Sequence, residues 1–326
     1  MREITYAEAL NEALREEMER DDTVFIMGQD VGKFGGIFGV TKGLYEKFGQ
    51  KRVRDTPLSE SAIIGGAVGA AAAGGMRPVC ELMLADFVGV CVDEIYNKAG
   101  KWKYMHGGTP DISIVVRAPM GAKGGGGSEH SQCPEALFMH GTGLKMLVPS
   151  TPYDAKGLLK GAIRDNDPVV FFEHKLLYVL KGQVPADDYL VPIGKAAVRK
   201  EGTDVTILAY SLMVHKAIEA ALTLEEQGIS AEVIDLRSLI PLDLETIFTS
   251  VAKTGRVVIA HEANKRGGMG AEISAVISEQ CFKELKGPIA RVAAPDVPIP
   301  FSPDLEQLYL PNAEKIITGV KLVLEK

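Results

Sequence analysis

The sequence predicts an α/β protein made of two doubly wound domains with mainly parallel sheets. Predicted strands alternate with predicted helices along the chain, as they do in βαβ units. The strands, such as the one at 169–173, are continuous apolar runs, which is typical of strands buried on both faces. The alternation stops near residue 175 and resumes near residue 200, after a stretch rich in Pro, Gly and Asp. We therefore place the first domain at residues 1–180, the linker at 181–200 and the second domain at 201–326.

The first domain begins with a helix at 5–20, in which apolar residues recur at helical spacing. A short buried strand at 24–27 and a glycine-rich loop at 28–39 follow. Residues 61–75 consist mainly of alanine and glycine and predict a tightly packed, buried helix that a neighbouring backbone or a second subunit could approach closely. The other elements expected here are helices at 41–48 and 87–101 and strands at 78–83, 112–117, 145–148 and 169–173.

The second domain repeats the alternation of strands and helices. Pro241 precedes a predicted helix, in keeping with the preference of proline for helix starts. A proline-rich segment at 295–303 leads to the last helix. The expected strands are 204–210, 230–235, 256–261 and 289–292, and the expected helices are 242–253, 214–227, 270–282 and 313–324.

The composition is that of an ordinary globular protein, with 46% apolar and 24% charged residues among 326. A net charge of −7 without a dominant basic patch argues against nucleic acids and anionic membranes as partners. The four cysteines lack CxxC or zinc-type spacing, which predicts reduced thiols and a cytoplasmic location. We expect neither a signal peptide nor a membrane span, because the N-terminus is charged and the Ala/Gly run is short and glycine-rich.

Several common types of site are not supported by the sequence. The glycine clusters at 65–69 and 267–270 lack the complete GxGxxG spacing of a nicotinamide-binding domain, and no GxxxxGK[ST] phosphate loop occurs. His261-Glu262 is not followed by a histidine at metalloprotease spacing, and the six histidines are scattered. The GxSxG elbow of serine hydrolases is also missing.

Three residues are candidates for chemistry, each with a plainer alternative. Glu60 ends the segment Asp55–Glu60 (Asp-Thr-Pro-Leu-Ser-Glu), between a strand-like run and a helix, where ligands bind in parallel α/β proteins; alternatively it only complements the helix dipole. His130 follows a glycine-rich loop and suits proton transfer near neutral pH, or is a solvated loop histidine. Phe87 is either a stacking surface for a flat ring at the sheet edge or a core residue.

Six motifs in this order resemble one family. The chain is similar to the beta subunit of the thiamine-diphosphate-dependent, decarboxylating component of 2-oxo acid dehydrogenase complexes. This transketolase-like family includes pyruvate, branched-chain 2-oxo acid and acetoin dehydrogenases. The resemblance covers essentially the whole chain, and its motifs are jointly specific: Gly28–Val31, Asp55–Glu60, His130–Gln132, Pro149–Leu158, Ala162–Val169 and Gly267–Ile273.

The resemblance implies a thiamine diphosphate that is shared with an alpha subunit. The alpha subunit would hold the diphosphate and Mg²⁺ through a GDG…N motif, which this chain lacks. Glu60 would hydrogen-bond the pyrimidine nitrogen, Phe87 would stack on the pyrimidine, and Leu58 and Gln29 would lie beside the cofactor. His130 would transfer protons or guide reduction of the lipoyl group. Pyruvate or acetoin would give the same hydroxyethyl-cofactor intermediate, and the acyl unit would pass to a lipoyl group of the acyltransferase core.

The resemblance also implies a potassium site and an assembly. Its positions are Ile114, Ala162, Ile163, Asp165 and Asp167, largely through backbone carbonyls. The first domain would be the pyrimidine-binding domain, and the second the cofactor-free carboxy-terminal domain. The expected assembly is an alpha2beta2 heterotetramer that docks on a dihydrolipoyl acyltransferase core.

Two departures from the family pattern stand out. Gln29 occupies a position that usually holds a glutamate, so a base is not expected there. The glycine tract at 124–127 is unusually long and predicts a looser loop around His130. Three segments, at 38–44, 173–178 and 212–216, are more similar to acetoin-cleaving members than to pyruvate members. Four alternatives remain: a branched-chain 2-oxo acid dehydrogenase beta subunit, a non-catalytic assembly subunit, a homologue without activity and a self-sufficient transketolase-like or nicotinamide enzyme.

Overall fold

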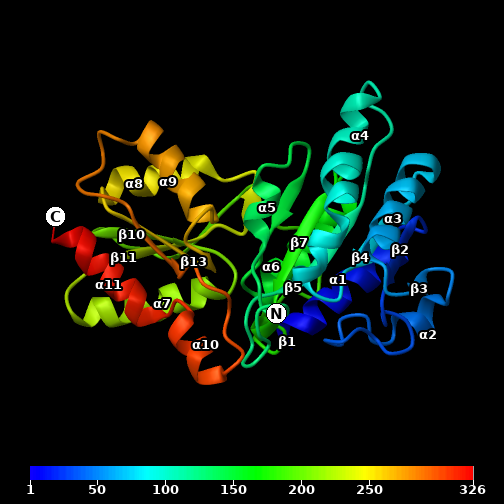
Figure 1. Ribbon diagram of the computed structural model, residues 1–326, viewed down its shortest axis with the longest axis horizontal. Helices are drawn as coiled ribbons and strands as arrows, with labels where there is room; N and C mark the ends of the chain where they lie inside the picture. The colour runs from blue at the N-terminus through cyan, green and yellow to red at the C-terminus, as the bar shows by residue number, and fades with distance from the viewer. Residues whose placement is uncertain (326) are drawn as a thin grey trace. The chain divides into compact units, whose positions relative to one another are not determined.

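The computed structural model describes residues 1–325 and confirms the α/β class (Figure 1). Contacts divide the chain into two compact units. The first joins Met1–Met120 to Leu137–Ile193, and the second joins Gly121–Ala136 to the chain from Gly194 onward. The segment that carries His130 therefore groups with the C-terminal half of the chain. Because the units interleave in this way, the predicted domain boundaries stay a prediction.

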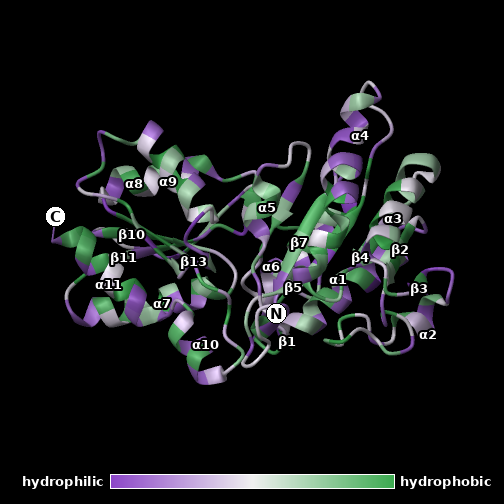
Figure 2. Cartoon of the chain, in the orientation of Figure 1, coloured by the Kyte–Doolittle hydropathy of each residue, from purple (hydrophilic) through white to green (hydrophobic). Residues whose placement is uncertain are grey.

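The first unit contains a parallel sheet with the order β6-β7-β5-β4-β2-β3. Every residue of β5 and β7 is buried, which accounts for their mainly apolar sequences, and Figure 2 draws most of β7 as hydrophobic. Because the strands are parallel, their carboxyl ends meet at one edge. Their bounds are β2 (Val24–Gly28), β3 (Val53–Asp55), β4 (Arg77–Glu81), β5 (Val115–Met120), β6 (Lys145–Leu147) and β7 (Val169–His174).

A small antiparallel ribbon completes the strands of this unit. β1 (Arg2–Thr5) pairs with β8 (Lys181–Val184), which lies inside the segment predicted to be a linker. Both strands are mostly exposed or half-buried. Their sequences therefore lack the apolar run by which the other strands were predicted.

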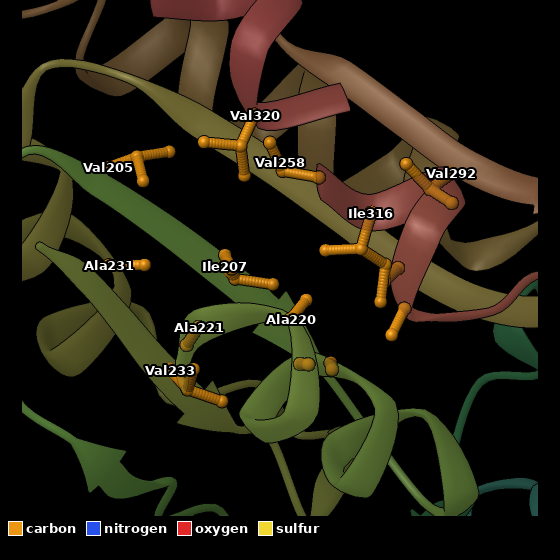
Figure 3. Packing of buried hydrophobic residues seen from close by; sticks show 14 of the residues in the cluster. Val205, Ile207, Ala220, Ala221, Ala231, Val233, Val258, Val292, Ile316 and Val320 are labelled. Atoms are coloured by element: carbon orange, nitrogen blue, oxygen red, sulfur yellow. The ribbon is translucent and has the colours of Figure 1, made fainter. Parts of the chain in front are cut away.

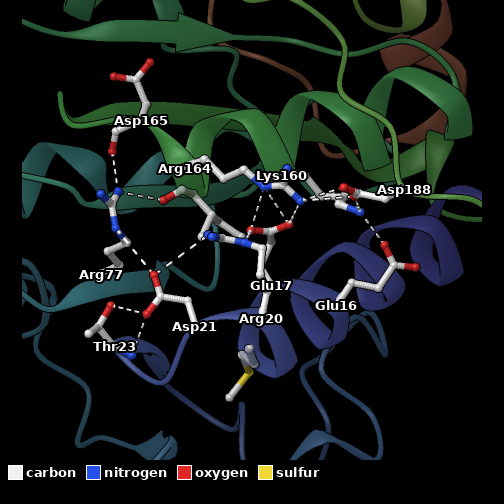
Figure 4. A network of polar contacts seen from close by, with 12 residues as sticks. Glu16, Glu17, Arg20, Asp21, Thr23, Arg77, Lys160, Arg164, Asp165 and Asp188 are labelled. Atoms are coloured by element: carbon white, nitrogen blue, oxygen red, sulfur yellow. Dashed lines mark hydrogen bonds and ion pairs between the residues drawn. The ribbon is translucent and has the colours of Figure 1, made fainter.

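Helices α1 (Tyr6–Arg20) and α6 (Pro152–Arg164) pack against each other with charged residues at their contact (Figure 4). The fully buried Glu17 carboxylate accepts hydrogen bonds from Arg164 and Arg20, at 2.7 Å each. Thr5 and Glu8 form a capping box at the start of α1. The other helical segments are α2 (Leu44–Phe48), α3 (Glu60–Gly74), η1 (Ala85–Cys91, 3₁₀), η2 (Glu94–Ala99, π), α4 (Gly100–Met105), α5 (Glu135–Met139) and η3 (Lys175–Leu177).

Helix α3 was predicted to be buried, and it is buried on one face only. Ile63, Ile64 and Ala67 face the interior, whereas Ala62 and Gly66 are exposed. Composition alone could not separate these faces, because small residues occur on both. The exposed face is the part of the helix that another backbone could approach closely.

The second unit contains a sheet with the order β14-β13-β10-β11-β9, in which only β9 is antiparallel. Its core joins β10, β11 and β13 to helices α7 and α11, through side chains such as Ile207, Val258 and Ile316 (Figure 3). The bounds are β9 (Ala197–Lys200), β10 (Val205–Ala209), β11 (Ala231–Asp235), β12 (Ser238–Ile240), β13 (Val257–Asn264), β14 (Ala290–Ala294), α7 (Leu212–Glu226), α8 (Leu244–Thr254), α9 (Met269–Gln280), α10 (Pro303–Tyr309) and α11 (Ala313–Leu324).

A buried ionic cluster joins three central strands of the first unit. Arg117 on β5 donates to Glu81 of β4 at 2.6 Å and to both carboxylate oxygens of Glu173 on β7, at 2.6 and 2.7 Å. Tyr178 donates its hydroxyl to Glu173 at 2.7 Å. Burial raises the pKa of Glu81, and the nearby Arg117 opposes that rise. The guanidinium therefore supplies the hydrogen-bond donors that two buried carboxylates share inside the sheet.

Replacing Arg117 by methionine is expected to lower the free energy of unfolding by about 3–5 kcal/mol, because two buried carboxylates lose their partner. Without the guanidinium the folded-state pKa of Glu81 rises further above its unfolded value, so the folded variant binds a proton more tightly than the unfolded chain. The loss should therefore shrink from about pH 8 to about pH 6. Denaturant unfolding of the wild type and the variant at both pH values measures this loss of unfolding free energy.

The matched control is Arg266→Met, because the Arg266 side chain is 83% exposed. This variant should lose less than about 1 kcal/mol at either pH. Equal losses in the two variants would contradict a special role for the buried cluster.

Candidate functional site

Residues predicted to contact a cofactor follow three neighbouring strands at one sheet edge. Gln29 comes directly after β2, Leu58 and Glu60 lie just after β3, and Phe87 lies in η1, shortly after β4. Strand β2 pairs in parallel with both β3 and β4. The structure therefore brings these four residues to the carboxyl edge of the sheet, where ligands bind in open α/β folds.

Hydrogen bonds hold the segments that follow β2 and β3 close together. The Thr56 amide donates to the carbonyl of Gly28 at 2.9 Å, and the Gly32 amide donates to the Asp55 carboxylate at 2.6 Å. A Cβ at Gly32 would lie 2.3 Å from an Asp55 oxygen, and one at Gly28 would lie 2.5 Å from the backbone oxygen of Glu81. Glycine is required at both positions because the backbone approaches other atoms so closely.

Two polar groups at this edge are buried without a partner inside the chain. Glu60 is 5% exposed, and among residues 1–325 its carboxylate receives no hydrogen bond. Gln29 is 8% exposed, and its Nε2 donor also has no acceptor in the described structure. Leu58, in contrast, is 76% exposed, and Phe87 is half-buried. A ligand with a flat ring and polar nitrogens would satisfy both buried groups, so these residues fit the pyrimidine of thiamine diphosphate.

The charge on Glu60 also acts on a neighbouring thiol. Burial, together with the carboxylates of Glu94 and Glu60, raises the pKa of Cys91 to about 12. Cys91 is therefore protonated at neutral pH and is not a nucleophile. The four cysteines are free thiols, as the sequence predicted.

His130 belongs to the second unit, where it is exposed on the segment Gly121–Ala136. Four glycines of this segment have φ between +69° and +90°, a backbone region that favours glycine. The looser loop predicted from the sequence stays a prediction, but its main chain has partners: the amides of Ala122, Gly124 and Gly125 donate to glutamate side chains of the second unit. Sequence reasoning could not find these contacts, because the glutamates lie more than 130 residues away.

A buried acidic cluster lies where the His130 segment ends. Tyr210 donates its hydroxyl to Glu135, which is completely buried. Burial raises the pKa of Glu135 to about 7, the hydrogen bond from Tyr210 opposes the rise, and Glu262 adds to it. The sequence analysis missed this cluster, since its members come from three distant segments and form no motif.

The five predicted potassium positions come together at the opposite edge of the first unit's sheet. Ile114 precedes β5, Ala162 and Ile163 lie in the last turn of α6, and Asp165 and Asp167 lie between α6 and β7. These are the amino ends of parallel strands, so an ion here would be remote from Glu60. A cavity of about 560 Å³ opens at this edge, lined in part by Lys103, Lys145 and Asp167.

Cationic side chains already occupy this edge. One nitrogen of Arg77 donates to the carbonyls of Ile163 and Asp165, at 3.1 and 2.8 Å (Figure 4). Lys145 donates to both carboxylate oxygens of Asp165, at 2.7 Å. Burial opposes ionisation of Asp167, but Lys145 and Lys103 lower its pKa. A carbonyl oxygen keeps a second lone pair, so these oxygens can still accept an ion.

Other classes of site find no support in residues 1–325. No group of three or more His, Cys, Asp or Glu side chains there is arranged to hold a metal ion. None of the helices in that range combines the length and apolarity needed to cross a membrane.

Comparisons with known proteins identify the family of both halves of the chain. Residues 2–181 match the transketolase pyrimidine-binding domain, and residues 194–316 match the transketolase C-terminal domain. The 2-oxoisovalerate dehydrogenase subunit beta of Bacillus subtilis is 50% identical over 324 residues and covers 99% of each chain. The acetoin:2,6-dichlorophenolindophenol oxidoreductase subunit beta of Cupriavidus necator is 49% identical, covering 99% of this chain and 98% of its own.

Two further similarities extend over the whole length. The pyruvate dehydrogenase E1 component subunit beta of Bacillus subtilis is 44% identical and covers both chains completely. A solved structure described as a split gene transketolase, an inactive beta4 tetramer, superposes with a TM-score of 0.82 at 27% identity over 99% of both chains. Family models and full-length relatives thus agree with each other, and the chain belongs to the transketolase-like family that includes the beta subunits of 2-oxo acid and acetoin dehydrogenases.

Proposed function

We propose that this chain is the beta subunit of a thiamine-diphosphate-dependent 2-oxo acid or acetoin dehydrogenase. With an alpha subunit it acts on pyruvate, acetoin or a branched-chain 2-oxo acid and passes the acyl unit to a lipoyl group. One observation carries the proposal: Glu60 is a buried carboxylate without a hydrogen-bond donor among residues 1–325, at the carboxyl edge of a parallel sheet. A buried charge of this kind needs a partner, and a ligand can supply it.

Each residue at this edge has a distinct task toward the cofactor. When bound, thiamine diphosphate supplies the electron sink for cleaving a bond next to a carbonyl. The Glu60 carboxylate would accept a hydrogen bond from a pyrimidine ring nitrogen in its protonated, N–H form, and the Phe87 ring would stack on the pyrimidine face. Gln29 donates from Nε2 and, as a neutral amide, is not a base; Leu58 adds apolar contact. His130 moves a proton near neutral pH or guides the lipoyl group.

The partners follow from what this chain lacks and from the names of its relatives. No GDG…N motif occurs in the sequence, so an alpha subunit holds the diphosphate and Mg²⁺. The relatives are named beta subunits, which supports a two-chain enzyme. We extend the proposal to an alpha2beta2 heterotetramer that docks on a dihydrolipoyl acyltransferase core. We also propose a cytoplasmic location, which the four free thiols support.

One ring contact joins segments that bear on the choice of substrate. Phe38 stacks on Tyr178 with ring centroids 4.7 Å apart and planes 21° apart, which joins two of the segments that are more similar to acetoin-cleaving members. Identities of 50%, 49% and 44% to relatives of three substrate types are too close to rank them. We therefore keep acetoin and pyruvate as the leading substrates and a branched-chain 2-oxo acid as the alternative.

A shared cofactor site predicts that thiamine diphosphate with Mg²⁺ binds only to a mixture of this chain and its alpha subunit. Calorimetric titration into the chain alone should give no binding heat, because the groups that hold the diphosphate are missing. Titration into the mixture should give saturable heat. Tight binding to the lone chain would overturn the half-site and favour a self-contained enzyme.

Glu60→Gln is expected to lower turnover by the reconstituted complex at least about 100-fold, as loss of a positioned proton-transfer group does. The substitution keeps the size of the side chain, so assembly with the alpha subunit and the melting temperature should be unchanged. The control is Glu46→Gln, because Glu46 is an exposed residue of α2. Full turnover by the Glu60 variant would favour the alternative function, a non-catalytic subunit that only docks the acyltransferase core.

Potassium remains part of the proposal and has its own test. An ion held by the carbonyls of Ala162, Ile163 and Asp165 predicts a higher melting temperature in KCl than in NaCl at equal ionic strength. Asp167→Ala should reduce that difference by removing a hard oxygen ligand. Identical melting curves in the two salts would mean that Arg77 and Lys145 supply all the positive charge that these oxygens need.

A further inference from the structure

The segment that carries His130 is attached to the second unit by two buried carboxylates. Glu262 on β13 accepts from the amide of Ala122 at 2.8 Å, just after the segment begins. Glu306 on α10 accepts from two successive amides, those of Gly124 at 2.7 Å and Gly125 at 3.2 Å. Glu306 is only 3% exposed. A carboxylate held by adjacent backbone amides is the arrangement by which turns of this type bind anions.

The same segment also packs closely against the chain around it. A Cβ on Gly127 would lie 3.0 Å from the Phe301 ring, and one on Gly126 would lie 2.4 Å from the hydroxyl of Ser131. The Ser128 hydroxyl donates to the carbonyl of Ile299 at 2.8 Å. The amide of Gly121 also donates to the carbonyl of Gln132 at 3.1 Å, which closes the base of the loop.

We propose that Glu306 is a positioning residue: by binding the amides of Gly124 and Gly125, its carboxylate fixes the loop that presents His130 to the reaction. Gly124 and Gly125 adopt φ of +90° and +80°, a backbone conformation that glycine allows. Glycine by itself does not hold the backbone in this conformation, and the hydrogen bonds to Glu306 do. Each bond has an ionised acceptor, which makes it stronger than a bond between neutral groups. This inference rests on the proposed role of His130 and adds the residue that holds it in place.

The decisive variant is Glu306→Gln, which keeps the size of the side chain but replaces one acceptor oxygen by an NH₂ group. That group would face a backbone N–H, so one of the two bonds is lost and two donors oppose each other. The matched control is Asp304→Asn, which removes a charge from an exposed residue of the same helix.

Loop mobility can be measured directly, because the exposed Lys123 precedes the Gly124 amide that Glu306 binds. We expect trypsin to cleave the Lys123–Gly124 bond about 10-fold faster or more in Glu306→Gln, since local opening governs cleavage of a folded chain. Cleavage at other exposed lysines should be unchanged. Asp304→Asn should behave as the wild type at all sites.

Turnover of the complex with the alpha subunit separates positioning from simple stabilisation. Glu306→Gln should lower kcat about 10- to 100-fold while KM stays within about twofold, as misplacing a reacting group does. Glu306→Asp keeps both acceptor oxygens on a shorter stem and should recover part of the loss. If Glu306→Gln fails to fold, Glu306→Asp carries the test, with the same direction of change in kcat and in cleavage after Lys123.

His130→Ala, measured in parallel, distinguishes failure of this inference from failure of the proposed function. Suppose that His130→Ala loses activity. If Glu306→Gln then keeps the kcat of the wild type, or its loop is cleaved after Lys123 as slowly as in the wild type, the positioning role is overturned and the proposed function stands. If His130→Ala retains full turnover, His130 has no part in the reaction and the inference falls with that role. A melting temperature that falls without any change in kcat would assign Glu306 to stability alone.

Discussion

The first unit depends on one buried cation, the guanidinium of Arg117. It connects β4, β5 and β7 through Glu81 and Glu173, and all three side chains are almost completely buried. Removing it would leave two charges in a low-dielectric interior, which is far costlier than the loss of a surface ion pair. Because the cluster spans neighbouring strands, the relative positions of these strands depend on ion pairs in the interior of the sheet.

That constraint reaches the candidate site through Glu81. Glu81 is the last residue of β4, and its backbone oxygen is approached so closely by Gly28 that a side chain there would collide with it. Gly28 in turn binds Thr56, which leads to Glu60 at the start of α3. The buried ionic cluster and the candidate site are thus connected by backbone contacts over a few residues, so the buried sheet supports the segment that carries Glu60.

The sequence predicted the parts of this protein that leave a local signal. Buried parallel strands such as β7 and the junction before Glu60 were predicted correctly, because apolar runs and turn residues are visible in one segment. The ribbon of β1 with β8 was missed, since its exposed residues form no apolar run. The contacts of Glu306 and Glu135 were also missed: each depends on residues that only the fold brings together, and a glycine-rich sequence by itself suggested mobility.

Buried glutamates show why Glu60 differs from the rest. Glu81 and Glu173 share a guanidinium, Glu306 binds backbone amides, and Glu135 has its pKa raised to about 7 beside Tyr210. The cost of burying each carboxyl group is thus offset by a nearby positive charge, by hydrogen bonds or, for Glu135, by a raised pKa that favours the protonated form. Among residues 1–325, the Glu60 carboxylate has no such donor. Of these buried glutamates, Glu60 is therefore the one whose carboxylate is left to accept a hydrogen bond from a ligand, as its proposed cofactor role requires.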